Sequence, residues 1–160
     1  MLVLAWIGAL GLLTLAFGFW EERQINPNTR PASFSSEALR EVVLERNRFG
    51  HYVANGSING QQVVFMLDTG ATDVVLSQGL ADKLGLARGA TQYAQTANGR
   101  VRVYATQLNS LALGSISLQN VRASINPAMS GREVLLGMSA LKQVEFTQRG
   151  NQLTLRQHLN

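Results

Sequence analysis

The feature that most constrains the fold of this chain is an uncharged apolar run at its start. From Leu2 to Trp20, nineteen consecutive residues carry no charge, and Thr14 is the only hydroxyl among them. About twenty apolar residues in a helix are enough to cross the hydrocarbon core of a bilayer. Trp6 and Trp20 lie toward the two ends of the run, where amphipathic rings favour the headgroup region. The run therefore predicts a transmembrane anchor over residues 1–20, with the membrane contacted through residues 2–20.

A secretory signal peptide is the alternative interpretation of this run. A signal peptide needs a basic stretch, a shorter apolar core and a small-residue cleavage site, whereas only Met1 precedes the run and the best site, Ala16-Phe17-Gly18, is poor. A retained anchor is therefore favoured. The flanking charges give little orientation, because two glutamates balance Arg23 and Arg30. We expect the short N-terminal tail to stay in the cytoplasm and the body of the protein to face outward.

Composition excludes several classes of function. The chain of 160 residues contains no cysteine, so disulfides, thiolate metal sites and a cysteine nucleophile are excluded. The net charge is +4, but the basic residues are scattered singly, unlike a nucleic-acid footprint. No metal-ligand spacing or phosphate loop occurs, and neither His51 nor His158 has a motif around it. We expect no metal, no cofactor and no nucleic-acid partner.

The rest of the chain divides into a connecting segment and one domain. Residues 21–40 contain two of the three prolines and few bulky apolar side chains, which predicts a flexible tether. Short β-rich runs then recur between turn signals, beginning with a strand over 41–46. The pair Asn59-Gly60 suits a two-residue type I′ hairpin, and Arg149-Gly150-Asn151 joins the last two strands.

Helical patterns within this domain are short. They cover only Ser77 to Leu84 and Met138 to Gln143. Many short strands with minor helices predict an all-β protein with a small closed barrel, one or two short helices and a preceding transmembrane helix. The predicted domain spans residues 41–160.

The chemistry is concentrated at the end of one predicted strand. Five apolar residues from Val63 to Leu67 deliver Asp68 into the dipeptide Thr69-Gly70. A carboxylate pressed against apolar surface is costly unless it is hydrogen-bonded or shares its charge, so such an aspartate rarely serves packing alone. The structural alternative is an Asx turn that merely ends the strand.

The tripeptide, preceded by its apolar strand and followed by Ala71-Thr72, resembles the active-site signature of the aspartic proteases, particularly the retroviral type (retropepsin-like, clan AA). The polar hairpin tip Ala94–Arg100 lies where that family has its flap, and Leu135-Leu136-Gly137 matches its apolar-apolar-glycine element before a short helix. The resemblance covers roughly residues 42–156. The chain also looks like a bacterial membrane-tethered subgroup with a single Asp-Thr-Gly, which implies the bacterial inner membrane with the protease domain in the periplasm.

The resemblance implies a closed barrel of the acid-protease type and an aspartic endopeptidase, in which two aspartates share one proton and activate a water molecule. Neither Asp73 nor Asp82 is followed by the Thr/Ser-Gly of a second motif, so one chain carries half a site. A symmetric homodimer would bring two Asp68 side chains together. The implied catalytic set is Asp68, Thr69, which would hydrogen-bond across the interface, and Gly70, which would donate its amide.

Substrate recognition is implied to occur by strand addition between the flap and the floor of the site. The candidate substrate-binding residues are Ala71, Thr72, Asp73, Thr96, Ala97, Asn98, Gly99 and Arg100, and the candidate structural supports are Leu135, Leu136 and Gly137. Position 72 is Thr where retroviral enzymes often have Asp. One alternative function stays open: a catalytically silent, membrane-tethered β-barrel that binds peptides or a protein partner. The intact Asp-Thr-Gly favours the enzyme.

Overall fold

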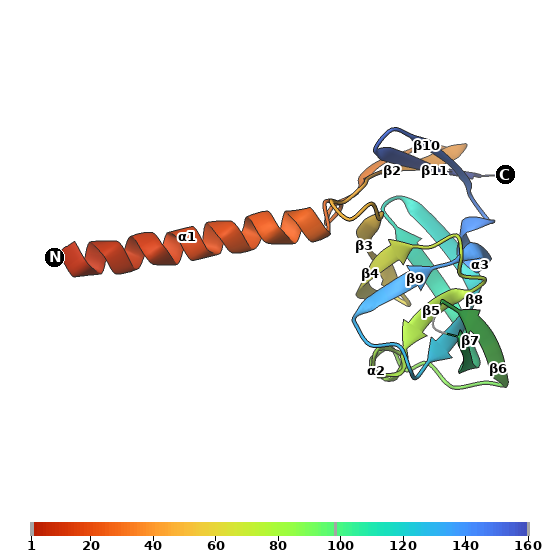
Figure 1. The fold of residues 1–160 in the computed structure, drawn as a ribbon. Helices are drawn as coiled ribbons and strands as arrows, with labels where there is room; N and C mark the ends of the chain where they lie inside the picture. The colour runs from red at the N-terminus through yellow and green to blue at the C-terminus, as the bar shows by residue number, and fades with distance from the viewer. Residues whose placement is uncertain (1, 98, 160) are drawn as a thin grey trace.

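The chain forms a β-domain from which one long helix projects, as the computed structural model shows for residues 2–97 and 99–159 (Figure 1). The helices are α1 (Leu2–Ile25), α2 (Gln78–Lys83) and α3 (Met138–Leu141). The strands are β1 (Ala32–Ser35), β2 (Leu39–Glu45), β3 (Val53–Ile58), β4 (Gln61–Leu67), β5 (Val74–Ser77), β6 (Thr91–Thr96), β7 (Gly99–Leu113), β8 (Ile116–Asn126), β9 (Glu133–Leu136), β10 (Glu145–Arg149) and β11 (Gln152–His158). The predicted all-β fold with short helices behind an apolar N-terminal helix is confirmed.

The larger sheet closes on itself. Its strands follow the order β3-β4-β9-β5-β8-β7-β6, and β3 also pairs with β7 through Ser57↔Ala112 and Ile58↔Leu111. This extra pairing makes the closed barrel that the sequence predicts. The smaller sheet has the order β1-β2-β11-β10, and its apolar residues join the same core.

Alternation along the strands explains how the core is filled. On β2, Val42 and Leu44 are fully buried, while Glu45 is exposed, as expected for a strand with one face on the core. The barrel contributes Phe65, Leu76 and other fully buried side chains to that core. The core therefore lies between the barrel and the smaller sheet.

The predicted turns and helices form for the expected local reasons. Asn59 and Gly60 have φ values of 50° and 79°, so both residues of the β3–β4 turn adopt the positive φ that a type I′ hairpin requires. Arg149 pairs with Gln152, so the last hairpin turns at Gly150-Asn151. Ser77 caps α2 by accepting a hydrogen bond from the Leu80 N–H.

The segment 21–40 differs from the flexible tether that its composition suggests. Helix α1 continues to Ile25, and Ala32–Ser35 pairs with β2. Asn28 is only 3% exposed: its Nδ2 donates to the Glu45 and Val53 carbonyls, both at 2.8 Å, and its Oδ1 accepts from the Glu45 N–H at 2.7 Å. An asparagine amide can satisfy strand backbone groups as a neighbouring strand would. This polar residue therefore docks the segment onto the domain.

Helix α1 itself stands away from the domain. From Val3 to Ile25 it is long and apolar enough to cross a membrane, a property that a signal sequence near the N-terminus shares. Among the described residues, none in its most apolar 18-residue window is buried, and only the last residues of α1 contact the domain.

Candidate active site

Asp68 lies at the end of β4, where three strands meet. Strand β9 runs between β4 and β5, parallel to β4 (Leu67↔Leu136) and antiparallel to β5 (Val75↔Leu135). The Asp68 N–H donates to the Leu136 carbonyl at 3.2 Å. The loop 68–73 that links β4 to β5 therefore crosses the end of β9.

Asp68 also shapes its own loop. Its Oδ1 accepts from the Gly70 N–H at 2.8 Å, and its carbonyl accepts from the Ala71 N–H at 3.2 Å. The Asx turn is thus present, but among the described residues the structure gives no further hydrogen bond to this carboxylate. Thr69 and Gly70 are exposed beside it. The Asx turn therefore does not exclude a chemical role for the Asp68 carboxylate.

Gly137 allows the loop to pack directly on the start of α3. The Ala71 carbonyl accepts from the Met138 N–H at 2.8 Å, and the Thr72 carbonyl accepts from the Ser139 N–H at 2.9 Å. A Cβ at position 137 would lie 2.7 Å from the Ala71 oxygen and would also meet the Asp73 oxygen. Close approach of two backbones therefore requires this glycine, and Leu135 and Leu136 place it there.

Ser139 is a support that the sequence did not single out. Its buried Oγ accepts from the Val74 N–H at 2.9 Å and donates to the Arg122 carbonyl at 2.6 Å. It thus ties the end of the loop to β8. The one feature of the sequence that could have pointed to Ser139 as a support is its position two residues after Gly137.

Asp73 is held by β8. Its Oδ1 accepts from Arg122 Nε at 2.6 Å, and its Oδ2 accepts from Ser124 Oγ at 3.0 Å. The Asp73 side chain is 14% exposed and that of Arg122 is 59% exposed. Asp73, a candidate substrate contact, therefore already has protein partners on both oxygens, and the sequence identified neither Arg122 nor Ser124 as one of them.

A hairpin covers the site, as predicted for residues 94–100. Strands β6 and β7 pair from Thr91↔Tyr104 to Thr96↔Gly99. Near the tip, Thr96 Oγ1 donates to the Gly99 carbonyl at 2.8 Å, and the Arg100 guanidinium lies 4.2 Å from the centroid of the Tyr93 ring. Asn98, a candidate substrate contact, lies outside the described residues.

A cleft of about 730 Å³ separates this hairpin from the loop 68–73. Of the sequence-predicted site residues, the structure brings Asp68, Gly70, Ala71, Thr72, Asp73, Thr96, Ala97 and Leu135 to its walls. Thr69, Gly99, Arg100, Leu136 and Gly137 are not part of the lining among the described residues. Lining residues that the sequence-predicted set omits are Val75, Gln92, Tyr93, Ala94, Gln95, Val103, Ser124 and Asn126. Consecutive residues of β6 line the cleft, so side-chain alternation along that strand would not have identified them.

A closed barrel, an Asp-Thr-Gly loop at a strand end and a hairpin across the resulting cleft define the class of retropepsin-like aspartic proteases. The family model described as "gag-polyprotein putative aspartyl protease" matches residues 54–143, which include the loop 68–73, the hairpin and Gly137. The chain belongs to this family.

One solved structure and two uncharacterized proteins are similar to this chain. A crystal structure of a retropepsin-like aspartic protease from Rickettsia conorii is similar with a TM-score of 0.65 and 28% sequence identity, covering 79% of this chain and 99% of that one. An uncharacterized protein in the cobV 5′ region of Sinorhizobium sp is 32% identical over 125 residues, which are 76% of this chain and 54% of the relative. The uncharacterized protein RP867 of Rickettsia prowazekii (strain Madrid E) is 31% identical over 112 residues, covering 68% and 47%. The chain thus spans about half the length of these two relatives.

Proposed function

We propose that this protein is an aspartic endopeptidase, anchored in a membrane by α1 and active as a homodimer. The observation that carries the proposal is the loop 68–73: one Asp-Thr-Gly, fixed by β9 and α3, faces a cleft beneath a hairpin. One loop provides one carboxylate, while peptide hydrolysis by this class of site uses two. A two-fold axis beside the exposed Thr69 supplies the second carboxylate from an identical chain.

The two Asp68 carboxylates would hold one proton between them and divide the chemistry. The ionised carboxylate takes a proton from water, whose oxygen bonds to the scissile carbonyl carbon, while the protonated carboxyl gives its proton to the carbonyl oxygen. The C–N bond then breaks as the amine nitrogen receives the proton taken from water, while a hydroxyl of the tetrahedral intermediate returns a proton to the other carboxylate and so restores the shared proton. Thr69 would hydrogen-bond across the interface, and the Gly70 N–H orients Asp68 as it does in the single chain.

The cleft is suited to an extended peptide. Strand β6 contributes consecutive residues from Gln92 to Thr96 to its wall, and the loop 68–73 forms the opposite wall. Main-chain pairing along such a strand would hold a peptide while alternate side chains enter pockets. We assign the substrate-binding role to Ala71, Thr72, Asp73 and the hairpin tip 96–100, and the supporting role to Leu135, Leu136 and Gly137.

For the whole chain, we propose an anchor over residues 1–20, a connection over 21–40 and a protease domain over 41–160. The length and composition of α1 support a single membrane span. The proposed location is the bacterial inner membrane with the domain in the periplasm.

The test is cleavage of a diverse peptide mixture by the full chain in mild detergent, between about pH 4 and 7, with new termini identified by mass spectrometry. Asp68→Asn should lower cleavage by about 10²- to 10⁴-fold, because it removes the acid–base pair. Asp82→Asn, the same change at an exposed residue of α2, should leave cleavage unchanged. Equal cleavage by both variants would contradict the assignment of Asp68. No cleavage by a wild type that sedimentation shows to be dimeric would favour the silent peptide-binding barrel.

The homodimer has its own test. When wild type and Asp68→Asn are mixed in equal amounts and allowed to exchange, half of the wild-type chains pair with a variant. Activity per wild-type chain should then fall to about half, because a mixed pair has one working carboxylate. Unchanged activity per wild-type chain, under conditions where subunit exchange is measured, would show that one chain suffices.

A further inference from the structure

The end of α1 is fastened to a loop of the domain, residues 46–51. Asn47 Nδ2 donates to the Ile25 carbonyl at 2.9 Å, and the Arg48 N–H donates to the Gln24 carbonyl at 3.5 Å. The loop holds its own shape, because Asn47 Oδ1 accepts from the Phe49 and His51 N–H groups at 3.0 and 2.9 Å. The backbone of Arg48 therefore lies level with Gln24 along the helix.

This level corresponds to the headgroup layer if α1 spans a bilayer. The apolar run ends at Trp20, and Gln24 is four residues further on, so at 1.5 Å per residue the loop begins about 6 Å above the hydrocarbon core. The polar layer on each side of a bilayer is roughly 5–8 Å thick. The connection from Ile25 to β2 cannot lengthen freely, because Asn28 is buried against Glu45 and Val53. The loop 46–51 is therefore held at the bilayer surface.

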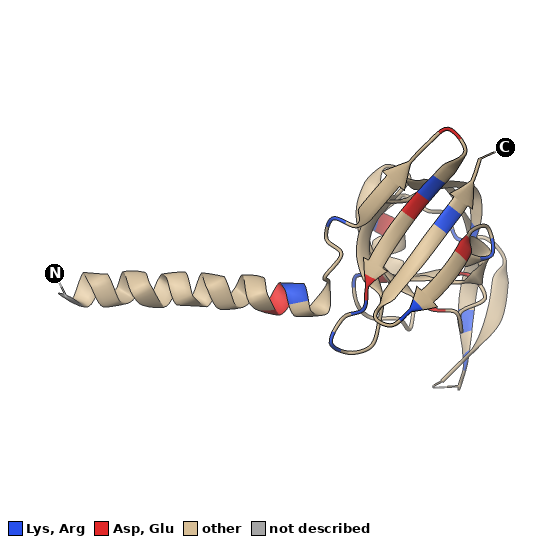
Figure 2. Cartoon of the chain, turned by 90° about the horizontal axis from the view of Figure 1, so that it is seen from above, with Lys and Arg blue, Asp and Glu red and all other residues tan. Residues whose placement is uncertain are grey.

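The side chains at this level suit a membrane surface. Phe49 is 57% exposed, and the Arg48 guanidinium lies 4.6 Å from the centroid of its ring. Residues 21–30 and 46–51 carry four arginines, partly offset by Glu21 and Glu22. Figure 2 shows basic positions on the domain loops that flank the end of the helix. An exposed aromatic ring among cations fits the interfacial layer of a bilayer that contains anionic lipids.

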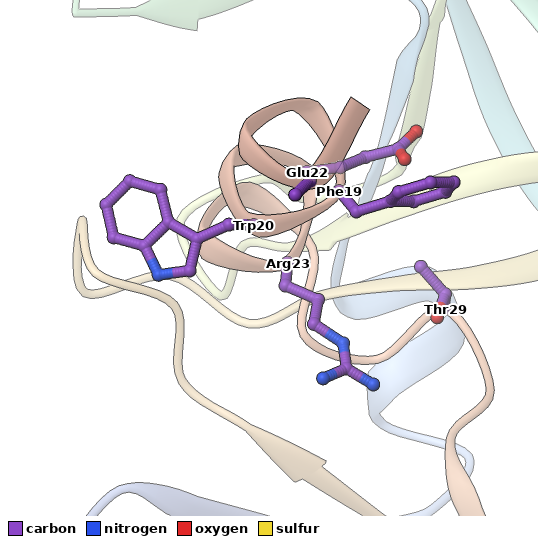
Figure 3. Close-up of a pocket in the computed structure, with 6 residues that line it drawn as sticks. Phe19, Trp20, Glu22, Arg23 and Thr29 are labelled. Carbon is purple, nitrogen blue, oxygen red and sulfur yellow. The ribbon is translucent and has the colours of Figure 1, made fainter. Parts of the chain in front are cut away.

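A hollow at the end of α1 adds to this surface. It has a volume of about 460 Å³ and is lined by Ala16, Phe19, Trp20, Glu22, Arg23 and Thr29. In Figure 3, Trp20 and Phe19 extend to opposite sides of the helix, and the Arg23 side chain lies between Trp20 and Thr29. Along α1 the apolar residues of the hollow come before Glu22 and Arg23, so its apolar end faces the hydrocarbon core and its charged end faces the headgroup layer.

We propose that this edge of the domain, formed by Arg23, Arg30, Arg46, Arg48 and Phe49, rests on anionic phospholipid headgroups as a second membrane contact beside α1. The inference rests on the anchoring part of the proposed function. Two contacts fix the tilt of the domain, and the β6–β7 hairpin lies on the side away from α1 (Figure 1). The cleft is thereby held clear of the bilayer, so the substrate segment is one that extends into the aqueous phase.

The chain has no cysteine, so single labels report on each part separately. A fluorophore is attached to His51→Cys in the loop, to Ala9→Cys in α1, or to Lys142→Cys, the exposed C-cap of α3 on the far side of the domain. The full chain is reconstituted in vesicles of phosphatidylcholine, with or without phosphatidylglycerol, that carry a headgroup nitroxide quencher. We expect quenching of the label at position 51 but not at 142, and more of it with phosphatidylglycerol. Phe49→Ser should reduce this quenching, and replacing Arg30 and Arg48 with Gln should lower the anionic preference about fivefold per arginine.

Equal, weak quenching at positions 51 and 142, with the label at position 9 shielded in the bilayer, would overturn the headgroup contact and leave the anchor intact. Quenching at position 51 that does not respond to Phe49→Ser or to the arginine changes would also overturn it. A label at position 9 that is accessible to water would refute the anchor and, with it, this inference. None of these outcomes bears on peptide cleavage, which depends on Asp68.

Discussion

Replacing Gly137 with alanine tests whether the candidate site depends on direct backbone contact between the loop 68–73 and α3. The added Cβ would lie 2.7 Å from the Ala71 oxygen and would overlap the Asp73 oxygen. Both are backbone atoms, so they cannot rotate away as a flexible side chain would. Overpacking of this kind costs about 1–3 kcal/mol. Moving the loop also lengthens the hydrogen bonds from the Met138 and Ser139 N–H groups, each worth about 1 kcal/mol.

The free energy of unfolding should therefore fall by about 2–4 kcal/mol, measured by chemical denaturation of the full chain in detergent and followed by circular dichroism. Hydrogen exchange at the Met138 and Ser139 amides should accelerate, and peptide cleavage should fall with it because Asp68 begins the same loop. Gly79→Ala is the matched control: this glycine lies in α2 with nothing within 4 Å of an added Cβ. Alanine there should be neutral or stabilise the helix by up to about 1 kcal/mol. A loss below about 1 kcal/mol for Gly137→Ala, with unchanged exchange at both amides, would refute the close-contact argument.

Two further substitutions test the supports of the connection and of the loop. Asn28→Ala removes three side-chain hydrogen bonds and should lower the free energy of unfolding by about 3 kcal/mol. Asn28→Asp should be no more stable than Asn28→Ala, because a carboxylate oxygen would face the Glu45 and Val53 carbonyls. Denaturation of both variants checks this, and a loss within about 0.5 kcal/mol for either would mean that the segment is not docked. Ser139→Ala leaves the buried Val74 N–H and Arg122 carbonyl without their partner and should cost about 1–3 kcal/mol, whereas Ser130→Ala, at an exposed serine, should stay within about 0.5 kcal/mol. Equal stability of the two serine variants would contradict the role of Ser139.

Local patterns in the sequence were sufficient to predict much of this architecture. Asn59-Gly60 predicted its hairpin because the turn type depends on two residues that tolerate positive φ. The roles of the hairpin over 94–100 and of Gly137 were implied by the resemblance to the retropepsin-like family, in which a flap and a glycine element follow the Asp-Thr-Gly in this order. These features depend on short stretches of chain, where residue type and spacing carry the information.

Contacts between distant residues were not predictable in the same way. Arg122 and Ser124 bind Asp73 across 49 and 51 residues of sequence, and nothing near them marks that contact. Asn28 stands in a polar, proline-containing stretch that favours a flexible tether, yet it is buried because its amide meets two strands. The composition of a segment indicates how it behaves in water. Whether one of its side chains is buried depends on the partners that the fold places beside it.

The docking of Asn28 also affects how two anchored copies would meet. A free connection of twenty residues would allow a domain to wander by roughly 25 Å around its anchor. The docked connection removes that freedom, so domains diffusing in one bilayer share the same height and upright pose. Their encounter becomes a two-dimensional search in which only the rotation of each domain about its own helix axis remains to be matched. The surface density of chains would then set how often two Asp68 loops come face to face.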